Sequence, residues 1–151
     1  SLGSPQLAET WILRGETWRE HTGTEPTARI GAYIAYSPQR DASLLLGGNV
    51  SGTTLWSWNG SNWSSTPTGG VSFTPGTPPD YDTQREAILW PTIESVTRIN
   101  QGVVTTAATG ISTQNGAAAY DPIRETLIFA GGQNSSGTYR LVDAPTGTGF
   151  L

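Results

Sequence analysis

The chain has 151 residues and a net charge of −4, because twelve carboxylates outnumber eight basic residues, all of them arginine. No basic cluster exists to neutralise phosphates, so nucleic acid is not an expected partner, and no apolar run is long enough for membrane insertion. Cysteine is absent, which excludes disulfides and thiolate chemistry. Nineteen glycines, ten prolines and six tryptophans favour turns and short strands. The expected fold class is therefore all-β.

The first predicted element is a hairpin over residues 10–20. Trp11 and Trp18 stand in the spacing Trp-x3-Gly-x2-Trp, and the same spacing recurs 45 residues later at Trp56 and Trp63. Glycine adopts positive φ without strain, which a tight hairpin turn requires. The recurrence indicates an internal repeat.

A longer motif occurs three times: a tyrosine, three residues, an arginine, an acid and then an apolar run. The tyrosine and arginine of the three copies are Tyr36 and Arg40, Tyr81 and Arg85, and Tyr120 and Arg124. The first and third copies end in a glycine pair, Gly47-Gly48 and Gly131-Gly132. A charge that recurs in every copy is expected to anchor a turn or to bridge neighbouring units.

The repeat divides the whole chain, 1–151, into units of about 40 residues with four short antiparallel strands each, as in propeller blades. In the first complete unit, 29–66, we expect strands at 30–36, 42–47, 54–59 and 62–65. A second full unit is expected at 70–107, and a partial unit with three strands at 115–143.

The motifs from Pro26 through Tyr36, Arg40 and the glycine pair to Trp63 resemble a kelch repeat, of the bacterial kind related to the galactose-oxidase central domain. That resemblance implies a kelch-like β-propeller, a fold that hosts both enzymes and binding modules. The segment 56–63 alone is also similar to the Trp-x-Trp-Asp-Gly-x-x-Trp stretch of small six-bladed fucose-binding lectins. The tyrosine–arginine–glycine motif does not match that second family.

About three blades are fewer than the four to eight of a closed ring. The hairpin at 10–20 is expected to close the C-terminal partial unit by pairing with it. The rest of the ring is expected from a homo-oligomer, with a dimer of six blades favoured, or from a longer parent chain.

The expected binding surface is centred on Trp58, which shares a strand face with Trp56. Aromatic faces stack on sugars, and Asn59, Asn62 and Arg29 are expected to bind hydroxyl groups. The other repeated tryptophans are expected to pack between blades: Trp11, Trp18 and Trp63.

No catalytic residue, cofactor or metal site is expected. His21 is the only histidine, so no Ser-His-Asp set is apparent, and the acids around Tyr81 lack the calcium-loop spacing. The expected function is a non-catalytic extracellular module that recognises a carbohydrate or a protein partner. The alternatives are a structural or adhesive surface protein of a virion, appendage or sheath, and a fucose-type lectin.

Overall fold

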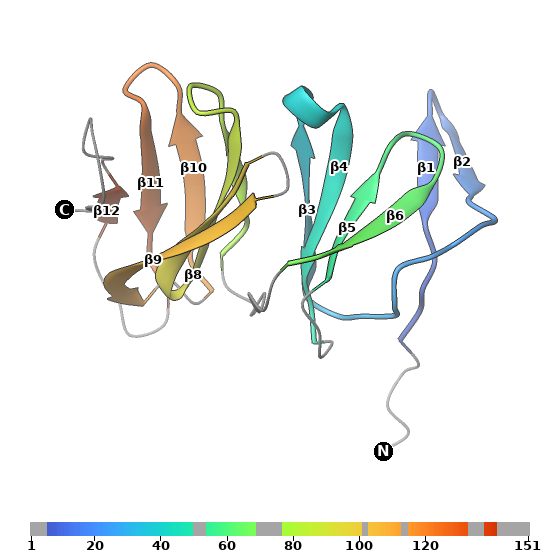
Figure 1. Cartoon of the computed structure of the whole chain (residues 1–151), viewed down its shortest axis with the longest axis horizontal. Helices are drawn as coiled ribbons and strands as arrows, with labels where there is room; N and C mark the ends of the chain where they lie inside the picture. Colours follow the sequence, from blue (N-terminus) through green and yellow to red (C-terminus); the bar gives the residue numbers. More distant parts are fainter. Residues whose placement is uncertain are drawn as a thin grey trace.

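The computed structural model describes residues 6–49, 54–68, 77–100, 103–112, 115–132 and 138–141, and these residues are all-β. Figure 1 shows a row of antiparallel sheets with the N-terminal hairpin at one end and the C-terminal sheet at the other. The described residues contain no α-helix and one 3-10 turn, Pro38–Arg40. They accordingly include no helix that could span a bilayer.

Four sheets hold the strands of the described residues. The N-terminal ribbon consists of β1 (Trp11–Arg14) and β2 (Thr17–Glu20). The first sheet contains β3 (Ala32–Ser37), β4 (Ala42–Gly47), β5 (Thr54–Trp58) and β6 (Trp63–Pro67). The second sheet contains β7 (Asp80–Asp82), β8 (Ala87–Asn100) and β9 (Val103–Ser112). The third sheet contains β10 (Ala117–Asp121), β11 (Thr126–Ala130) and β12 (Thr138–Leu141).

The first sheet is a meander in which each strand pairs with the next one along the chain. Its strands lie where the sequence predicts them, with ends shifted by at most two residues. The apolar run of β4 is continuous because the strand is buried on both faces: Leu44 and Leu46 are fully buried on one face, and Leu45 is 9% exposed on the other.

The second sheet differs from the expected four-stranded unit, because its described part has three strands and β8 extends over 14 residues, with a register shift between Ile93 and Ser95. Residues 92–99 contain no glycine or proline, so nothing ends the strand before Asn100. Pro91 is tolerated because it lies between the ladder with β7, which ends at Leu89, and the ladder with β9, which begins at Ile93. Residues 70–76 and 101–102 of the expected second unit lie outside the described residues, as do residues 133–137 and 142–143 of the third.

The N-terminal ribbon does not close the C-terminal sheet, contrary to the expectation. Strands β1 and β2 pair only with each other, while β10, β11 and β12 form a separate sheet at the far end of the row (Figure 1). The ribbon is instead attached to the first sheet, through a hydrogen bond from Trp63 to Thr10. The described residues therefore form an open row and not a closed ring.

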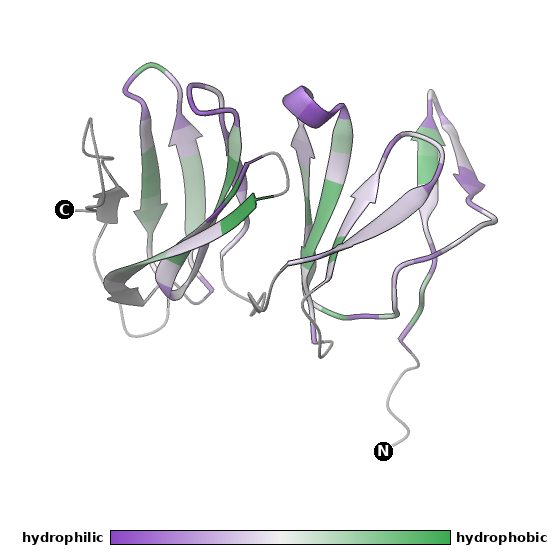
Figure 2. Ribbon diagram, viewed as in Figure 1, coloured by the Kyte–Doolittle hydropathy of each residue, from purple (hydrophilic) through white to green (hydrophobic). Residues whose placement is uncertain are grey.

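Two hydrophobic cores join the three larger sheets face to face. The first lies between the first and second sheets and contains Leu44, Leu46, Leu55, Ile88, Trp90 and Ile99. The second lies between the second and third sheets and contains Leu89, Val96, Tyr120 and Leu127. Figure 2 shows the corresponding hydrophobic residues along β4, β8 and β11. Each sheet thus buries a face against its neighbour in the row.

The turn between the first two strands of the second and third sheets is built in the same way. One oxygen of Asp82 accepts the backbone N–H groups of Gln84 and Arg85, at 3.0 Å each, and its other oxygen accepts the Arg85 guanidinium at 3.0 Å. Asp121 repeats this pattern with Arg124, whose guanidinium lies 2.7 Å away. The recurring arginine therefore anchors a turn in the second and third copies of the motif.

The acid that follows each arginine has a backbone task. Asp41, Glu86 and Glu125 all adopt the left-handed conformation, with φ of 46°, 50° and 53°. This residue is the last one of the turn, and the next strand begins directly after it. Its recurrence thus reflects the backbone path of the turn.

The two aspartate turns provide a matched stability test. The side chain of Asp82 is fully buried, whereas that of Asp121 is 17% exposed and its partner Arg124 is 68% exposed. Asp82→Ala should lower the free energy of unfolding by about 3 kcal/mol, because it removes a fully buried carboxylate and leaves the partly buried Arg85 without its ion-pair partner. Asp121→Ala should cost clearly less, since water replaces the lost partner. Urea denaturation of both variants measures the difference, and equal losses would contradict the role of burial.

Tyr120 lies beside Asp82, and this pair makes stability depend on pH. Burial and the Asp82 carboxylate raise the pKa of Tyr120 to about 12 from an ordinary 10.0. A raised folded-state pKa contributes stability that is complete below pH 10 and is lost as the pH rises through 12. Tyr120→Phe should therefore flatten the loss of unfolding free energy between pH 10 and pH 12. Urea titrations across this range test it, and an unchanged slope would count against it.

Candidate functional site

The predicted binding residues are positioned by the hairpin of β5 and β6. Trp58 and Trp63 are directly opposite in the ladder, with ring centroids 5.4 Å apart and a tilt of 53°. The Asn59 side-chain oxygen accepts the backbone N–H groups of Ser61 (3.0 Å) and Asn62 (2.8 Å). Gly60 has φ of +92°, the conformation for which the repeat keeps a glycine. Asn59 thus holds the turn with its oxygen.

Trp58 contacts two other aromatic rings. The ring of His21 meets it edge to face, with centroids 4.9 Å apart and planes at 86°, and Trp63 lies beside it. Trp56 and Trp58 are both half-buried, whereas Trp63 is 8% exposed. Trp58 is therefore a partly exposed ring with a fixed orientation.

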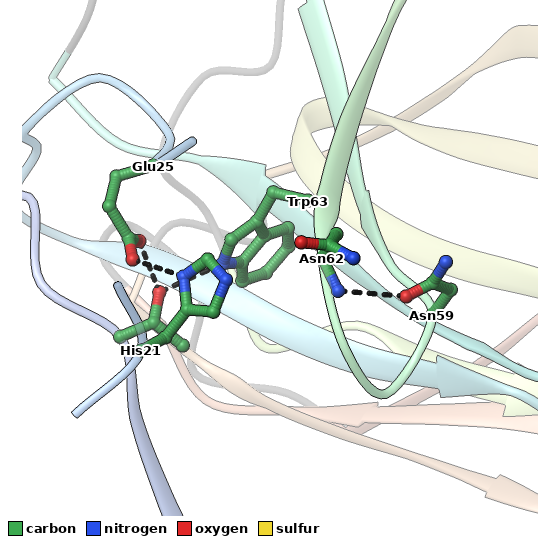
Figure 3. Close-up of polar contacts among 6 residues, drawn as sticks. His21, Glu25, Asn59, Asn62 and Trp63 are labelled. Atoms are coloured by element: carbon green, nitrogen blue, oxygen red, sulfur yellow. Dashed lines mark hydrogen bonds and ion pairs between the residues drawn. The ribbon is translucent and has the colours of Figure 1, made fainter. Parts of the chain in front are cut away.

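A chain of hydrogen bonds fixes His21 and Trp63 in turn (Figure 3). The Trp63 indole N–H donates to the Thr10 hydroxyl at 2.8 Å, and that hydroxyl donates to Glu25 at 2.5 Å. The other Glu25 oxygen lies 2.6 Å from His21 Nδ1, and the His21 backbone N–H donates to the Thr10 carbonyl at 2.9 Å. This network ties the ribbon and the segment after it to the first sheet.

Arg29 lies away from this cluster. Its guanidinium donates to the carbonyls of Thr27 (2.9 Å) and Gly47 (3.0 Å), and burial lowers its pKa. Gly47 is four residues along β4 from Ser43, which pairs with Trp58, so the two ends are about 13 Å apart. The structure brings Trp56, Trp58, Asn59 and Asn62 together on one hairpin and does not bring Arg29 to them.

The glycine pairs of the repeat are explained by backbone conformation. Gly47 and Gly48 have φ of 68° and 100°, and Gly131 and Gly132 have φ of 74° and 104°. A Cβ on Gly48 would also lie 3.0 Å from the Cβ of Arg29. Both pairs therefore make the same left-handed turn, which other residues rarely adopt.

The repeated tryptophans differ in exposure. Trp11 is 50% exposed and its counterpart Trp56 is partly buried, while Trp18 is 60% exposed and its counterpart Trp63 is buried. An open groove of about 340 Å³ lies between the ribbon and the first sheet; its walls include Leu7, Trp11, Arg29, Ile34, Leu45 and Trp63. The groove is the space between the N-terminal segments and the inner strands of that sheet.

The sequence did not single out Thr10 and Glu25. It brought in His21 only as the single histidine, when a Ser-His-Asp set was excluded. The Thr10–Glu25 contact spans 15 residues and the Thr10–Trp63 contact spans 53. No local spacing signals contacts of that kind. Within the described ranges, no group of three or more histidines and acids is arranged to hold a metal ion.

Comparisons of the chain with protein-family models, with curated proteins and with solved structures found no match.

The hydrogen-bond network predicts a specific stabilising role for Thr10. Thr10→Val keeps the shape of the side chain but leaves the Trp63 indole N–H and a Glu25 oxygen without their partner, so it should cost about 1–2 kcal/mol of unfolding free energy. The control Thr17→Val, on the exposed strand β2, should change it by about 0.5 kcal/mol or less. Thermal or urea unfolding compares them, and a neutral Thr10→Val would refute the role.

Proposed function

We propose that the chain is a non-catalytic recognition module that binds carbohydrate at the tip of the β5–β6 hairpin. The observation that carries this proposal is the partly exposed ring of Trp58, whose orientation is set by contacts with His21 and Trp63. An aromatic ring that is already ordered loses little conformational entropy when a ligand stacks on it. Trp58 would provide the stacking platform.

Polar groups beside the ring would bind sugar hydroxyls. Asn59 and Asn62 are exposed at the tip, and the Asn59 oxygen already serves the turn, so its amide N–H₂ group is the part directed to a ligand. The net charge of −4 disfavours sulfated or other acidic glycans. A neutral sugar is the expected ligand class.

The kelch-like propeller remains part of this proposal. The four-stranded meander of the first sheet, the two identical aspartate turns and the face-to-face stacking of successive sheets support it. An extracellular or particle-surface location is proposed with it, because a glycan ligand would be encountered there. In such a ring, β5 and β6 would be outer strands and their tip would face outward.

A second candidate function is a structural or adhesive surface protein. It is favoured by apolar side chains that the chain leaves exposed on strands: Trp18 at 60%, Ile34 at 63%, Tyr36 at 52% and Ile128 at 37%. Surfaces of this kind on a folded protein commonly mark contacts with other proteins. Packing would then be the function itself.

A glycan array that includes fucosylated glycans, probed with the full chain, tests the recognition proposal. Trp58→Ala should weaken binding to any glycan hit by roughly tenfold or more, and Asn62→Ala by less. The control Trp18→Ala removes a more exposed indole elsewhere and should leave binding unchanged. Thermal unfolding of each variant separates loss of the fold from loss of the site.

Two outcomes would overturn the assignment. No binding to any glycan by the folded wild-type chain would reject carbohydrate recognition and favour the structural candidate. Binding that is lost in Trp18→Ala but kept in Trp58→Ala would move the site to the ribbon.

A further inference from the structure

The three larger sheets stack in a row, all in the same orientation, and each sheet has two different faces. We call the face that carries the repeat tyrosine the leading face and the opposite one the trailing face. The second sheet packs its leading face, with Tyr81, Ile88 and Trp90, on the trailing face of the first sheet. The third sheet packs its leading face, with Tyr120 and Leu127, on the trailing face of the second. The chain therefore makes the same kind of interface twice.

Polar contacts fix how the sheets are placed in these interfaces. The Tyr120 backbone N–H donates to Asp80 at 2.7 Å, which joins the third sheet to the second. The amide of Gln39 donates to Glu86, which joins the second sheet to the turn of the first. Both contacts lie at or near the tyrosine–arginine turn, so that turn helps to set the register between neighbours.

The two ends of the row leave one half of this interface open at each end. On the leading face of the first sheet, Ile34 is 63% exposed and Tyr36, the first repeat tyrosine, is 52% exposed. The N-terminal ribbon is bound to Trp63 on the outer strands of this face, and the groove beside the N-terminal segments extends to Ile34. The side chains of Ile34 and Tyr36 on β3 remain exposed.

The third sheet exposes the complementary half. On the trailing face of β10 and β11, Ile128 is 37% exposed and pairs in register with the exposed Ala119. Ala117 and Ala130, also exposed, are paired with each other on the same face. The described surface on these two strands is small and mainly apolar, with Asp121 at the end of β10, and isoleucine occupies the place that Leu89 fills in the second sheet.

We propose that copies of this chain associate head to tail: the trailing face of β10 and β11 of one copy packs on the exposed leading face of β3 of the next. The occupant is a second copy because the chain carries both halves of an interface that it already makes twice internally. The two patches differ from each other, so the contact is heterologous and either closes a ring or extends a chain of subunits. This inference does not depend on carbohydrate binding.

The two open patches allow a complementation test by light scattering after size exclusion. The wild-type chain should be dimeric or larger. Ile34→Arg and Ile128→Arg should each weaken association by roughly tenfold or more, because each places a charge in one half of the contact. Mixed together, the two variants should form a one-to-one complex, since each supplies the half that the other lacks. Ile123→Arg, at an 87% exposed turn position, is the control and should match wild type.

Several outcomes would overturn the proposal. One is a wild-type chain that is monomeric at high concentration, and another is a mixture of the two variants that forms no complex. A third is association that is lost in Ile34→Arg but kept in Ile128→Arg, which would indicate a two-fold contact between leading faces. Circular dichroism and thermal unfolding establish that each variant is folded. Ala119→Arg provides a second variant of the trailing face should Ile128→Arg fail to fold.

Discussion

The packing of one sheet face on the next is the interaction on which the described structure depends. The first core holds six buried side chains, three from each side of a sheet boundary. Burial of a large apolar side chain contributes roughly 1.5–3 kcal/mol, whereas a typical hydrogen bond contributes about 0.5–1.5 kcal/mol net. The polar contacts between sheets are few, so apolar packing provides most of the stability and the hydrogen bonds set the register.

The residues of the repeat divide between packing and backbone tasks. The second and third tyrosines contribute to the cores, and the second and third arginines each bind an aspartate. The acids and the glycine pairs take left-handed conformations. A left-handed glutamate costs roughly 1–2 kcal/mol relative to an ordinary backbone. Glu86 and Glu125 tolerate it because Asp82 and Asp121 fix the turns that precede them. Recurrent charges in this chain therefore have structural causes.

The sequence predicts local pairing well and contacts between distant segments poorly. The strands of the first sheet follow from apolar runs bounded by turn residues, and the tyrosine–arginine turns follow from their spacing. The length of β8 was missed because the repeat suggested a turn where β-branched residues continue the strand. The place of the N-terminal ribbon was missed because it depends on Thr10, His21 and Glu25. No spacing of residues in the sequence predicts the contacts that these three make.

The leading face of the first sheet serves two separate purposes on different strands. Trp56 lies opposite Leu45 in the ladder, so the outer strands and the inner strands share that face. The ribbon and His21 contact its outer part, which orders Trp58, while Ile34 and Tyr36 on the inner part stay open. A ligand at the hairpin tip and a sheet stacked on β3 would therefore occupy different places. A row of stacked sheets leaves one face exposed at each end. The ribbon can therefore cover the outer part of the leading face while the inner part stays available for stacking.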